Sequence, residues 1–491
     1  MVGSRRSKTC ALAMNARPAL MSLYSKYVLP RIIGPGMSNA GTRLLRAPWI
    51  PLASREVFVL TVFCLAIYSQ DKPNAITVGR NVPIVQQTGA GIYLEPHLAI
   101  DPANHQHLAL GAISIQSSVP SVVAFHSNDG GQVWHSAALP GTDRKAAFDP
   151  WLAFGPSGDI YMAALIGAAD IVVHRSSDGG QNWLPSVAVP RGTGGAFDHP
   201  AIAVDRTNGR FARTVYVVAS QSARSPTGKK VYPTSIMRSV DEGKTYSPPV
   251  QVLANNFNNE NGNPVVLNDG TLVVPFFEIT VNGKWLEHPR LWIVTSEDGG
   301  ASFSSPYLVT QHFSGHSFPV LACSRGHSPN RLYLVWASKE ETGGENVFLS
   351  NSSDNGETWS VPVRVNESAG QANTAARIPT IAVTDAGTVG VTWIDRRAAP
   401  TSKCSNVYFA ASRDGGQTFL PNVRISEAQT CSDATGNHVP FGDGKTTVGE
   451  RWEAGGDYSG LVAADGVFHA VWADTRSGSY QLWHTTIRVE E

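Results

Sequence analysis

Short apolar segments separated by turn residues repeat along the chain from about residue 76 to its end. Each repeat has one apolar strand, a tight turn and a second apolar strand. The seven pairs are 96–101 with 108–111, 151–154 with 160–163, 201–204 with 215–218, 265–267 with 272–274, 320–322 with 332–336, 380–383 with 389–393, and 460–463 with 468–472. Apolar residues at helical spacing are not sustained after residue 75. The pattern predicts an all-β protein made of seven similar units.

A turn motif, Ser-x-Asp-x-Gly-x-x-aromatic, follows six of these units. Its aspartates, 49 to 63 residues apart, are Asp129, Asp178, Asp241, Asp298, Asp354 and Asp414. The Ser and Asp oxygens can accept hydrogen bonds from the backbone N–H groups of their own turn, and the Gly tolerates positive φ. The motif therefore predicts a structural hairpin loop. We expect these aspartates on the rim opposite any binding site.

The seventh unit continues into the apolar segment 480–484 and has no turn motif after it. It therefore lacks an outer strand, whereas segment 76–85 looks like an outer strand with no unit before it. Joining the two would close a ring of four-stranded sheets and leave only short edges. The fold class predicted is all-β, a seven-bladed β-propeller in which the N-terminal strand completes the last blade. Residues 70–491 would form this single domain.

Composition agrees with many short strands and turns, because Gly (46) and Pro (31) are abundant and charged residues make up only 16%. Charge is distributed unevenly. Residues 1–69 carry nine Lys and Arg against one acid, which leaves 30 basic and 38 acidic side chains in the rest of the chain. A net negative body is the opposite of what a phosphate backbone requires. We therefore expect no nucleic-acid partner.

The basic leader, residues 1–69, ends in an uncharged apolar run, 57–68. This run is shorter than the ~20 residues of a membrane span and suits the apolar core of a secretory signal. We expect cleavage after Ser69 and a secreted body with no stable membrane span. An uncleaved N-terminal anchor, also facing outside, is the alternative. Translation from Met37 would give a leader of more ordinary length.

Three cysteines lie outside the leader. Cys404 and Cys431 flank the sixth turn motif and could form a disulfide, which export permits. Cys323 lies in an apolar strand and should be unbridged. No Cys and His residues have zinc-ligand spacing, so we expect no metal and no cofactor.

The turn-motif series resembles the Asp-box (BNR) proteins, of which the sialidases are the best-known members. The resemblance covers residues 76–489. Arg377-Ile378-Pro379 is similar to the strand that carries one arginine of the sialidase triad, and Tyr458-Ser459-Gly460-Leu461 is similar to the context of the tyrosine nucleophile. Glu260 lies one residue out of register with the glutamate that activates this tyrosine. The resemblance implies a site in which Arg377 binds a carboxylate and Tyr458 attacks the sugar with Glu260, or Asp198 in its place, as base.

The sequence also departs from the sialidase pattern. Arg377 lies in the sixth unit and not in the first, which has Glu95 at the corresponding place. The other two triad arginines have no counterpart at matching positions. Seven blades also exceed the six of a sialidase catalytic domain.

Residues just before the first strand of each unit should gather at the axis of a propeller. They include Glu95, Asp149, Asp198, His199, Arg377, Asp457 and Tyr458. Glu95, Asp149, His199 and Asp457 are therefore candidates for substrate binding, since carboxylates suit hydroxyl-rich ligands and glycoside hydrolysis. A polar channel mouth is also common to propellers in general.

Two further features adjoin this region. Asp395 with Arg396 and Asp474 with Arg476 follow Trp393 and Trp472, and we interpret them as structural ion pairs repeated between blades. The Gly-rich insertion 431–456 is the longest between units, and we expect it to cover the channel entrance.

Three functions remain open on these grounds. The first is a sialidase-type glycoside hydrolase and the second a non-catalytic propeller that binds glycan or protein. The third is a glycosidase for neutral sugars that uses paired carboxylates. In each case the expected partner is an extracellular glycan or glycoprotein, and we expect a monomer.

Overall fold

The computed structural model describes residues 75–85, 91–116, 119–141, 145–167, 169–225, 228–253, 257–281, 284–286, 289–313, 317–324, 330–340, 344–367, 375–399, 401–442 and 444–490. The predicted leader, 1–69, lies outside these residues, so its role as a signal or anchor stays a prediction. Within the described ranges there is no helix long and apolar enough to cross a membrane.

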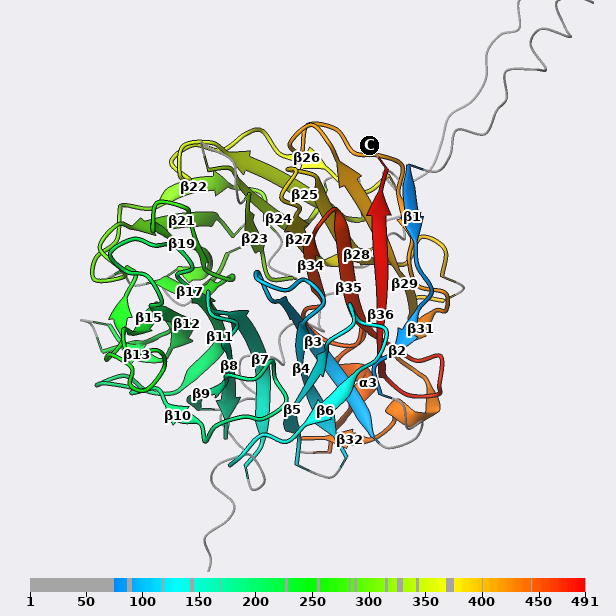
Figure 1. Ribbon diagram of the computed structural model, residues 1–491, viewed down its shortest axis with the longest axis horizontal. Helices are drawn as coiled ribbons and strands as arrows, with labels where there is room; N and C mark the ends of the chain where they lie inside the picture. Colours follow the sequence, from blue (N-terminus) through cyan, green and yellow to red (C-terminus); the bar gives the residue numbers. More distant parts are fainter. Residues whose placement is uncertain are drawn as a thin grey trace, which may run out of the picture. The chain divides into compact units, whose positions relative to one another are not determined.

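The propeller unit comprises Ala75–Phe441 and Thr446–Glu491 and contains seven antiparallel sheets arranged around an axis (Figure 1). Each sheet is one blade. The inner strands of blades 1 to 7 are β3 (Ile92–Ile100), β7 (Ala147–Phe154), β11 (Phe197–Val204), β17 (Phe257–Asn261) with β18 (Val265–Val266), β23 (Val320–Cys323), β27 (Ala376–Val383) and β34 (Gly460–Ala464). The predicted seven-bladed propeller is confirmed.

Each inner strand continues outward through the remaining strands of its blade. The second strands are β4 (Leu108–Ile115), β8 (Ile160–Ile166), β12 (Val215–Gln221), β19 (Leu272–Val281), β24 (Leu332–Lys339), β28 (Val389–Asp395) and β35 (Val467–Asp474). The third strands are β5 (Ser121–Ser127), β9 (Asp170–Ser176), β15 (Thr234–Ser239), β21 (Leu291–Ser296), β25 (Glu345–Ser352), β29 (Cys404–Ser412) and β36 (Gln481–Val489). The outer strands of blades 1 to 6 are β6 (His135–Ala137), β10 (Val187–Ala188), β16 (Val250–Gln251), β22 (Tyr307–Thr310), β26 (Val363–Arg364) and β30 (Val423–Arg424).

The N-terminal segment supplies the outer edge of blade 7. Strands β1 (Ile76–Val78) and β2 (Val82–Pro83) both pair antiparallel with β36, with Ile76 opposite Val489 and Val82 opposite His484. Figure 1 shows this blue segment beside the red C-terminal strand. Closure of the ring by segment 76–85 is thus confirmed.

The core lies between neighbouring blades, where the sheets press apolar faces together. Its largest side chains with less than 2% of their surface exposed include Trp336, Trp393, Trp472, Tyr216 and Phe409. Such burial explains why the second strands are nearly all apolar, since they are covered on both faces.

The six turn motifs share one hydrogen-bond pattern. In the fifth, Ser352 Oγ donates to Asp354 Oδ1 at 2.7 Å, and Oδ1 also accepts from the Thr358 N–H at 3.0 Å. In the first blade, the register places Ser127 opposite Leu108, which in turn pairs with Ile100 at the end of the inner strand. The motif therefore lies at the far end from Glu95, as predicted.

The repeated Trp-x-Asp residues also form structural contacts. Trp393 Nε1 donates to Asp395 Oδ2 at 3.0 Å, and Trp472 Nε1 donates to Asp474 Oδ2 at 3.0 Å. Asp395 pairs with Arg397 and Asp474 with Arg476. The interpretation as structural ion pairs holds, except that the partner of Asp395 is Arg397 and not Arg396. Arg396 instead forms an ion pair with Glu453, which belongs to the insertion 431–456.

The insertion 431–456 is ordered around a disulfide and a short helix. Cys404 and Cys431 are bonded with Cα atoms 4.0 Å apart, and Cys323 is unbridged, as predicted. The insertion contains β31 (Thr430–Cys431), the turn η1 (Thr435–Asn437), the hairpin of β32 (Pro440–Phe441) and β33 (Thr446–Thr447), and helix α3 (Val448–Arg451). The remaining short strands are β13 (Ala223–Arg224), β14 (Lys230–Val231) and β20 (Lys284–Trp285).

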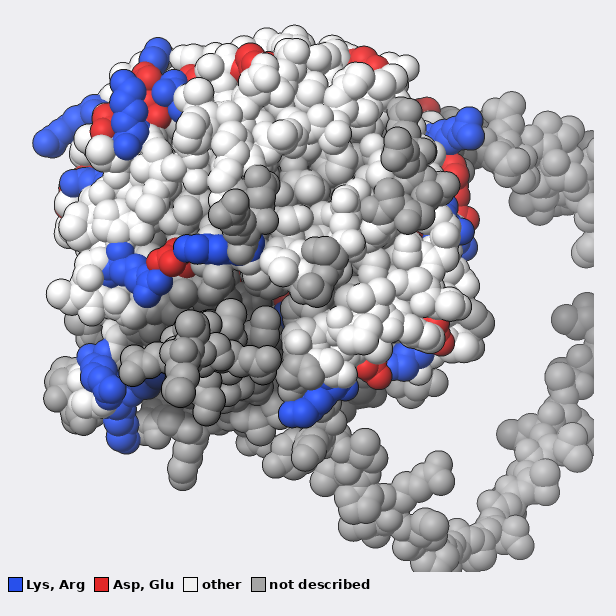
Figure 2. Space-filling model, turned by 90° about the horizontal axis from the view of Figure 1, so that it is seen from below, with Lys and Arg blue, Asp and Glu red and all other residues white. Residues whose placement is uncertain are grey.

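Charged side chains are sparse on the described surface. On the face in Figure 2, Lys and Arg lie beside Asp and Glu in small mixed groups, and most of the area is uncharged. This face offers no broad basic track for a polyanion.

Candidate functional site

Four inner strands carry a bulge near the end that faces the channel mouth. The residue at each bulge has positive φ: Glu95 (50°), Asp149 (52°), His199 (55°) and Ile378 (53°). Each precedes a proline, and the strand register shifts at this point in β3, β7, β11 and β27. Side chains other than Gly adopt this conformation at a cost of roughly 1–3 kcal/mol, and such strain concentrates at functional sites. Three of the four are polar residues that we had singled out as candidates.

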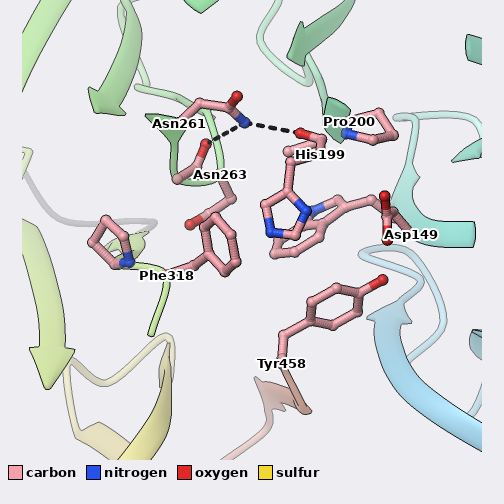
Figure 3. Close-up of a pocket in the computed structure, with 11 residues that line it drawn as sticks. Asp149, His199, Pro200, Asn261, Asn263, Phe318 and Tyr458 are labelled. Carbon is pink, nitrogen blue, oxygen red and sulfur yellow. Dashed lines mark hydrogen bonds between the residues drawn. The ribbon is translucent and has the colours of Figure 1, made fainter. Parts of the chain in front are cut away.

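A pocket lies among these bulges at the centre of the propeller (Figure 3). It encloses about 290 Å³, including space open to solvent. Its walls come from blades 2, 3, 4, 5 and 7 and include Asp149, Trp151, His199, Asn261, Phe318 and Tyr458. Of the residues that the prediction placed around one axis, Asp149, His199 and Tyr458 line this pocket. Glu95, Asp198, Arg377 and Asp457 are not among its lining residues.

Aromatic rings form much of the wall. The centroids of His199 and Phe318 are 3.5 Å apart, and those of Trp151 and Tyr458 are 5.4 Å apart. Asn261 Nδ2 donates to the backbone oxygen of His199 at 3.1 Å, which fixes the strained bulge (Figure 3). Apolar ring faces beside polar groups are the usual composition of a small-ligand site.

Glu95 is not among the residues that line the pocket and is only 2% exposed. Its Oε1 accepts hydrogen bonds from Trp452 Nε1 at 2.7 Å and from the Asp457 N–H at 3.3 Å. Burial, followed by the charges of Asp457 and Asp149, raises the pKa of Glu95 well above its usual value. Burial and the neighbouring carboxylates thus favour the protonated form of this carboxyl.

Tyr458 projects into the same space, and in Figure 3 its hydroxyl lies on the side of Asp149. The hydroxyl donates to the backbone oxygen of Pro150 at 3.3 Å. Burial, then Glu95, Asp149 and Asp457, raises the pKa of Tyr458 well above its usual value. The phenol is consequently neutral at pH 7, and the carboxylate that acts on it most strongly is Glu95 and not Glu260.

Glu260 belongs to a second part of the acidic cluster. Burial, then the charges of Asp198 and Asp457, raises the pKa of Glu260 to about 8. Asp457 thus acts on both Glu95 and Glu260 and links the two parts. We name Glu95, Asp149, Asp198, Glu260 and Asp457 together the axial carboxylate cluster.

A cation that the sequence had not indicated enters this cluster from the insertion. Arg451, at the end of α3, pairs with Asp457 at 3.2 Å, and its guanidinium lies 4.9 Å from the ring of Trp452. Burial disfavours its charge, but Asp457, Glu95 and Asp149 outweigh this effect and raise the pKa of Arg451. The sequence does contain a signal for helix α3, the Thr447-x-x-Glu450 capping box, which predicts that a helix starts after Thr447.

Arg377 has a different environment. Its Nε forms an ion pair with Glu345 of blade 5, a residue 3% exposed. Arg377 is not among the residues that line the pocket, and no arginine is found among the described lining residues. The structure thus brings Glu95, Asp149, Asp457 and Tyr458 together, links Asp198 and Glu260 to them, and directs Arg377 to Glu345. The catalytic and binding roles of these residues stay predictions.

The cluster does not have the form of a metal site. Among described residues, a group compact enough to hold an ion is formed by Cys404, Cys431 and Asp433, and its two thiols are consumed by the disulfide.

Comparison with known proteins decides the family. The family model described as a BNR repeat-like domain matches residues 164–469. The chain belongs to this family. It is a BNR-repeat β-propeller, as the turn motifs had indicated. None of the curated proteins compared with the chain matches it.

Several solved structures are similar in fold at low identity. A Dyadobacter fermentans protein of unknown function is 12% identical with a TM-score of 0.49, over 85% of this chain and 100% of that one. A Hadza microbial sialidase is 17% identical with a TM-score of 0.45, over 76% and 75%. A mutant α-L-arabinofuranosidase from Fusarium graminearum is 12% identical with a TM-score of 0.48, over 68% and 98%. At such identities the function has to be argued from the residues of this chain.

Proposed function

We propose that this BNR propeller is a glycoside hydrolase for neutral sugars of extracellular glycans, with the axial carboxylate cluster as its catalytic apparatus. The arrangement that carries the proposal is the axial carboxylate cluster beside the aromatic pocket that Asp149 and Tyr458 line. Within the cluster, burial and then the charges of Asp198 and Asp457 raise the pKa of Glu260 to about 8. Titratable groups whose surroundings separate their pKa values are a mark of acid and base roles.

The charges in the pocket favour a neutral substrate. A sialoside brings a carboxylate, which requires converging guanidinium groups. Here Arg451 is engaged by Asp457, Arg377 is engaged by Glu345, and the surrounding groups are acidic. Repulsion from the axial carboxylate cluster would disfavour an anionic sugar.

The roles follow from protonation and position. Glu260, protonated at neutral pH, would donate a proton to the leaving oxygen, and Asp198 or Asp149 would act as the ionised base or nucleophile. Tyr458 would donate a hydrogen bond to a sugar hydroxyl, because its high pKa makes it a poor nucleophile. The rings of Trp151 and Phe318 would pack against the apolar face of the sugar.

A second candidate is a propeller that binds glycan without cleaving it. The close packing of His199 on Phe318 and of Trp151 beside Tyr458 favours it, since aromatic walls hold a sugar whether or not chemistry follows.

The test uses the protein without its predicted leader, residues 70–491, with fluorogenic glycosides of neutral sugars and a matched sialoside. We expect cleavage of a neutral glycoside and none of the sialoside. Glu260→Gln should lower kcat by ~100-fold or more, the usual contribution of a general acid. Release of sialic acid would support sialidase chemistry instead. Glycan binding without cleavage of any substrate would support the second candidate.

A further inference from the structure

The insertion 431–456 contacts the axial carboxylate cluster through a buried tryptophan. Trp452 is 2% exposed and donates its Nε1–H to Glu95 Oε1 at 2.7 Å. A short hydrogen bond to a carboxyl buried this deeply is strong and directional. It joins the insertion to the strained bulge of blade 1.

Trp452 is itself held from several sides. Its backbone oxygen accepts a hydrogen bond from the Tyr480 hydroxyl at 2.7 Å, and its backbone N–H donates to the backbone oxygen of Val448 at 3.0 Å. The ring meets Phe441 of β32 edge to face, with centroids 4.7 Å apart. The indole therefore has one orientation and can impose it on its partner.

Glu95 is fixed from the other directions by residues that follow Trp452. The Glu95 N–H donates to the Gly455 oxygen at 3.0 Å, and the Asp457 N–H donates to Glu95 Oε1. A Cβ on Gly456 would lie 2.6 Å from Glu95 Cγ, and φ there is +146°, so a larger residue would displace the carboxyl. Glu95 Oε2 has no hydrogen-bond partner among the described residues.

We infer that Trp452 is a positioning residue of the axial site, which holds the Glu95 carboxyl in place beside Tyr458 through its Nε1–H. The inference rests on the proposed function in that it assigns Trp452 to the same site. It adds that the insertion, through Trp452, is part of the catalytic apparatus.

The electrostatic surroundings give the inference a measurable consequence. Glu95 faces Asp457 and Asp149, which favour its protonated form, and Arg451 and Trp452, which favour its ionised form. The phenol of Tyr458 faces it as well. Removal of the Trp452 donor should therefore shift the titration of Glu95 to higher pH.

The experiment compares Trp452→Phe with Trp393→Phe in the 70–491 protein. Trp393 donates an equivalent hydrogen bond to buried Asp395 in blade 6, so its change controls for the loss of an indole–carboxylate bond as such. In Trp452→Phe we expect a limb of the kcat/KM pH profile to move up by about one pH unit, the effect of one hydrogen bond to a charged group. In Trp393→Phe the profile should keep its shape.

A second readout does not require activity. The melting temperature should fall more between pH 5 and 8 in Trp452→Phe than in the wild type, and this difference should vanish in a Glu95→Gln background. If this larger fall in melting temperature appears while no glycoside is cleaved, the proposed function fails and the positioning role of Trp452 stands. If neither the profile nor the melting curve changes relative to Trp393→Phe, the inference is wrong. Should Trp452→Phe not fold, Thr447→Ala weakens the helix cap behind the indole, and no shift there would also overturn it.

Discussion

Arg377 and Glu345 form an ion pair across the interface between blades 5 and 6. Glu345 is 3% exposed, whereas about a third of the Arg377 side chain is exposed, so the guanidinium serves first to neutralise a buried carboxylate. This relationship gives the Arg-Ile-Pro segment a structural contact between blades, whereas a role of Arg377 in substrate binding stays a prediction.

Arg377→Ala should therefore affect stability more than activity. Loss of the guanidinium removes a counter-charge from buried Glu345, and we expect the free energy of unfolding to fall by about 2 kcal/mol, with kcat/KM for a neutral glycoside within about twofold. Urea unfolding measures the first quantity. Glu345→Gln in the Arg377→Ala background should restore part of the loss. A large fall in kcat/KM at unchanged stability would contradict this view.

Glu260 should make stability depend on pH. Its pKa is about 8 in the folded protein and near 4.3 in the unfolded chain, so between these values the folded state binds the additional proton. Stability is then greatest below the lower value and declines as pH rises toward 8. Glu260→Gln should remove this decline, as seen by thermal unfolding at pH 5, 6, 7 and 8. Parallel curves for variant and wild type would show that Glu260 titrates normally.

Asp354→Ala should weaken the fifth turn without altering the axial site. The Asp354 carboxylate accepts from Ser352 and Thr358, and loss of these partners should cost about 1–2 kcal/mol. Glu357→Ala in the same loop is the control, because that side chain is exposed. Chemical denaturation measures the cost. Altered substrate affinity at unchanged stability would argue against a structural role.

Asn81→Ala should loosen the closure of the ring. Asn81 Nδ2 donates to the Ile425 oxygen at 3.0 Å, and its Oδ1 accepts from the Glu427 N–H at 2.8 Å, which joins the N-terminal strand to blade 6. Because Asn81 is 3% exposed, its loss should lower the free energy of unfolding by about 2 kcal/mol. Hydrogen exchange of β36 amides should increase at the same time. Unchanged exchange would show that β1 and β2 suffice to close the ring.

Removal of the disulfide by Cys404→Ser with Cys431→Ser should cost about 3 kcal/mol in the chain-entropy estimate. The two cysteines are 27 residues apart, and Cys323→Ser offers a control without a bridge. Thermal unfolding of the two variants provides the comparison. Equal melting temperatures would mean that the insertion keeps its place without the bond.

Much of the fold could be predicted because local patterns specify it. The six Ser-x-Asp-x-Gly turns and the unpaired segment 76–85 gave the blades and their closure. Axial candidates such as Glu95, Asp149 and His199 could be named because they precede the first apolar segment of a unit, which in a propeller lines the axis. The partners of these residues could not be predicted, since they depend on how a Gly-rich insertion folds. Arg451 and Trp452 look like ordinary loop residues until α3 places them beside Glu95.

The hydrogen bond between Trp452 and Glu95 joins residues 357 positions apart in the chain. A ribosome must therefore complete nearly the whole protein before this hydrogen bond can form, and a truncated product that ends before Trp452 lacks it. Catalysis, where measured, would report on completion of the ring, so activity and global structure should be lost in the same transition on heating.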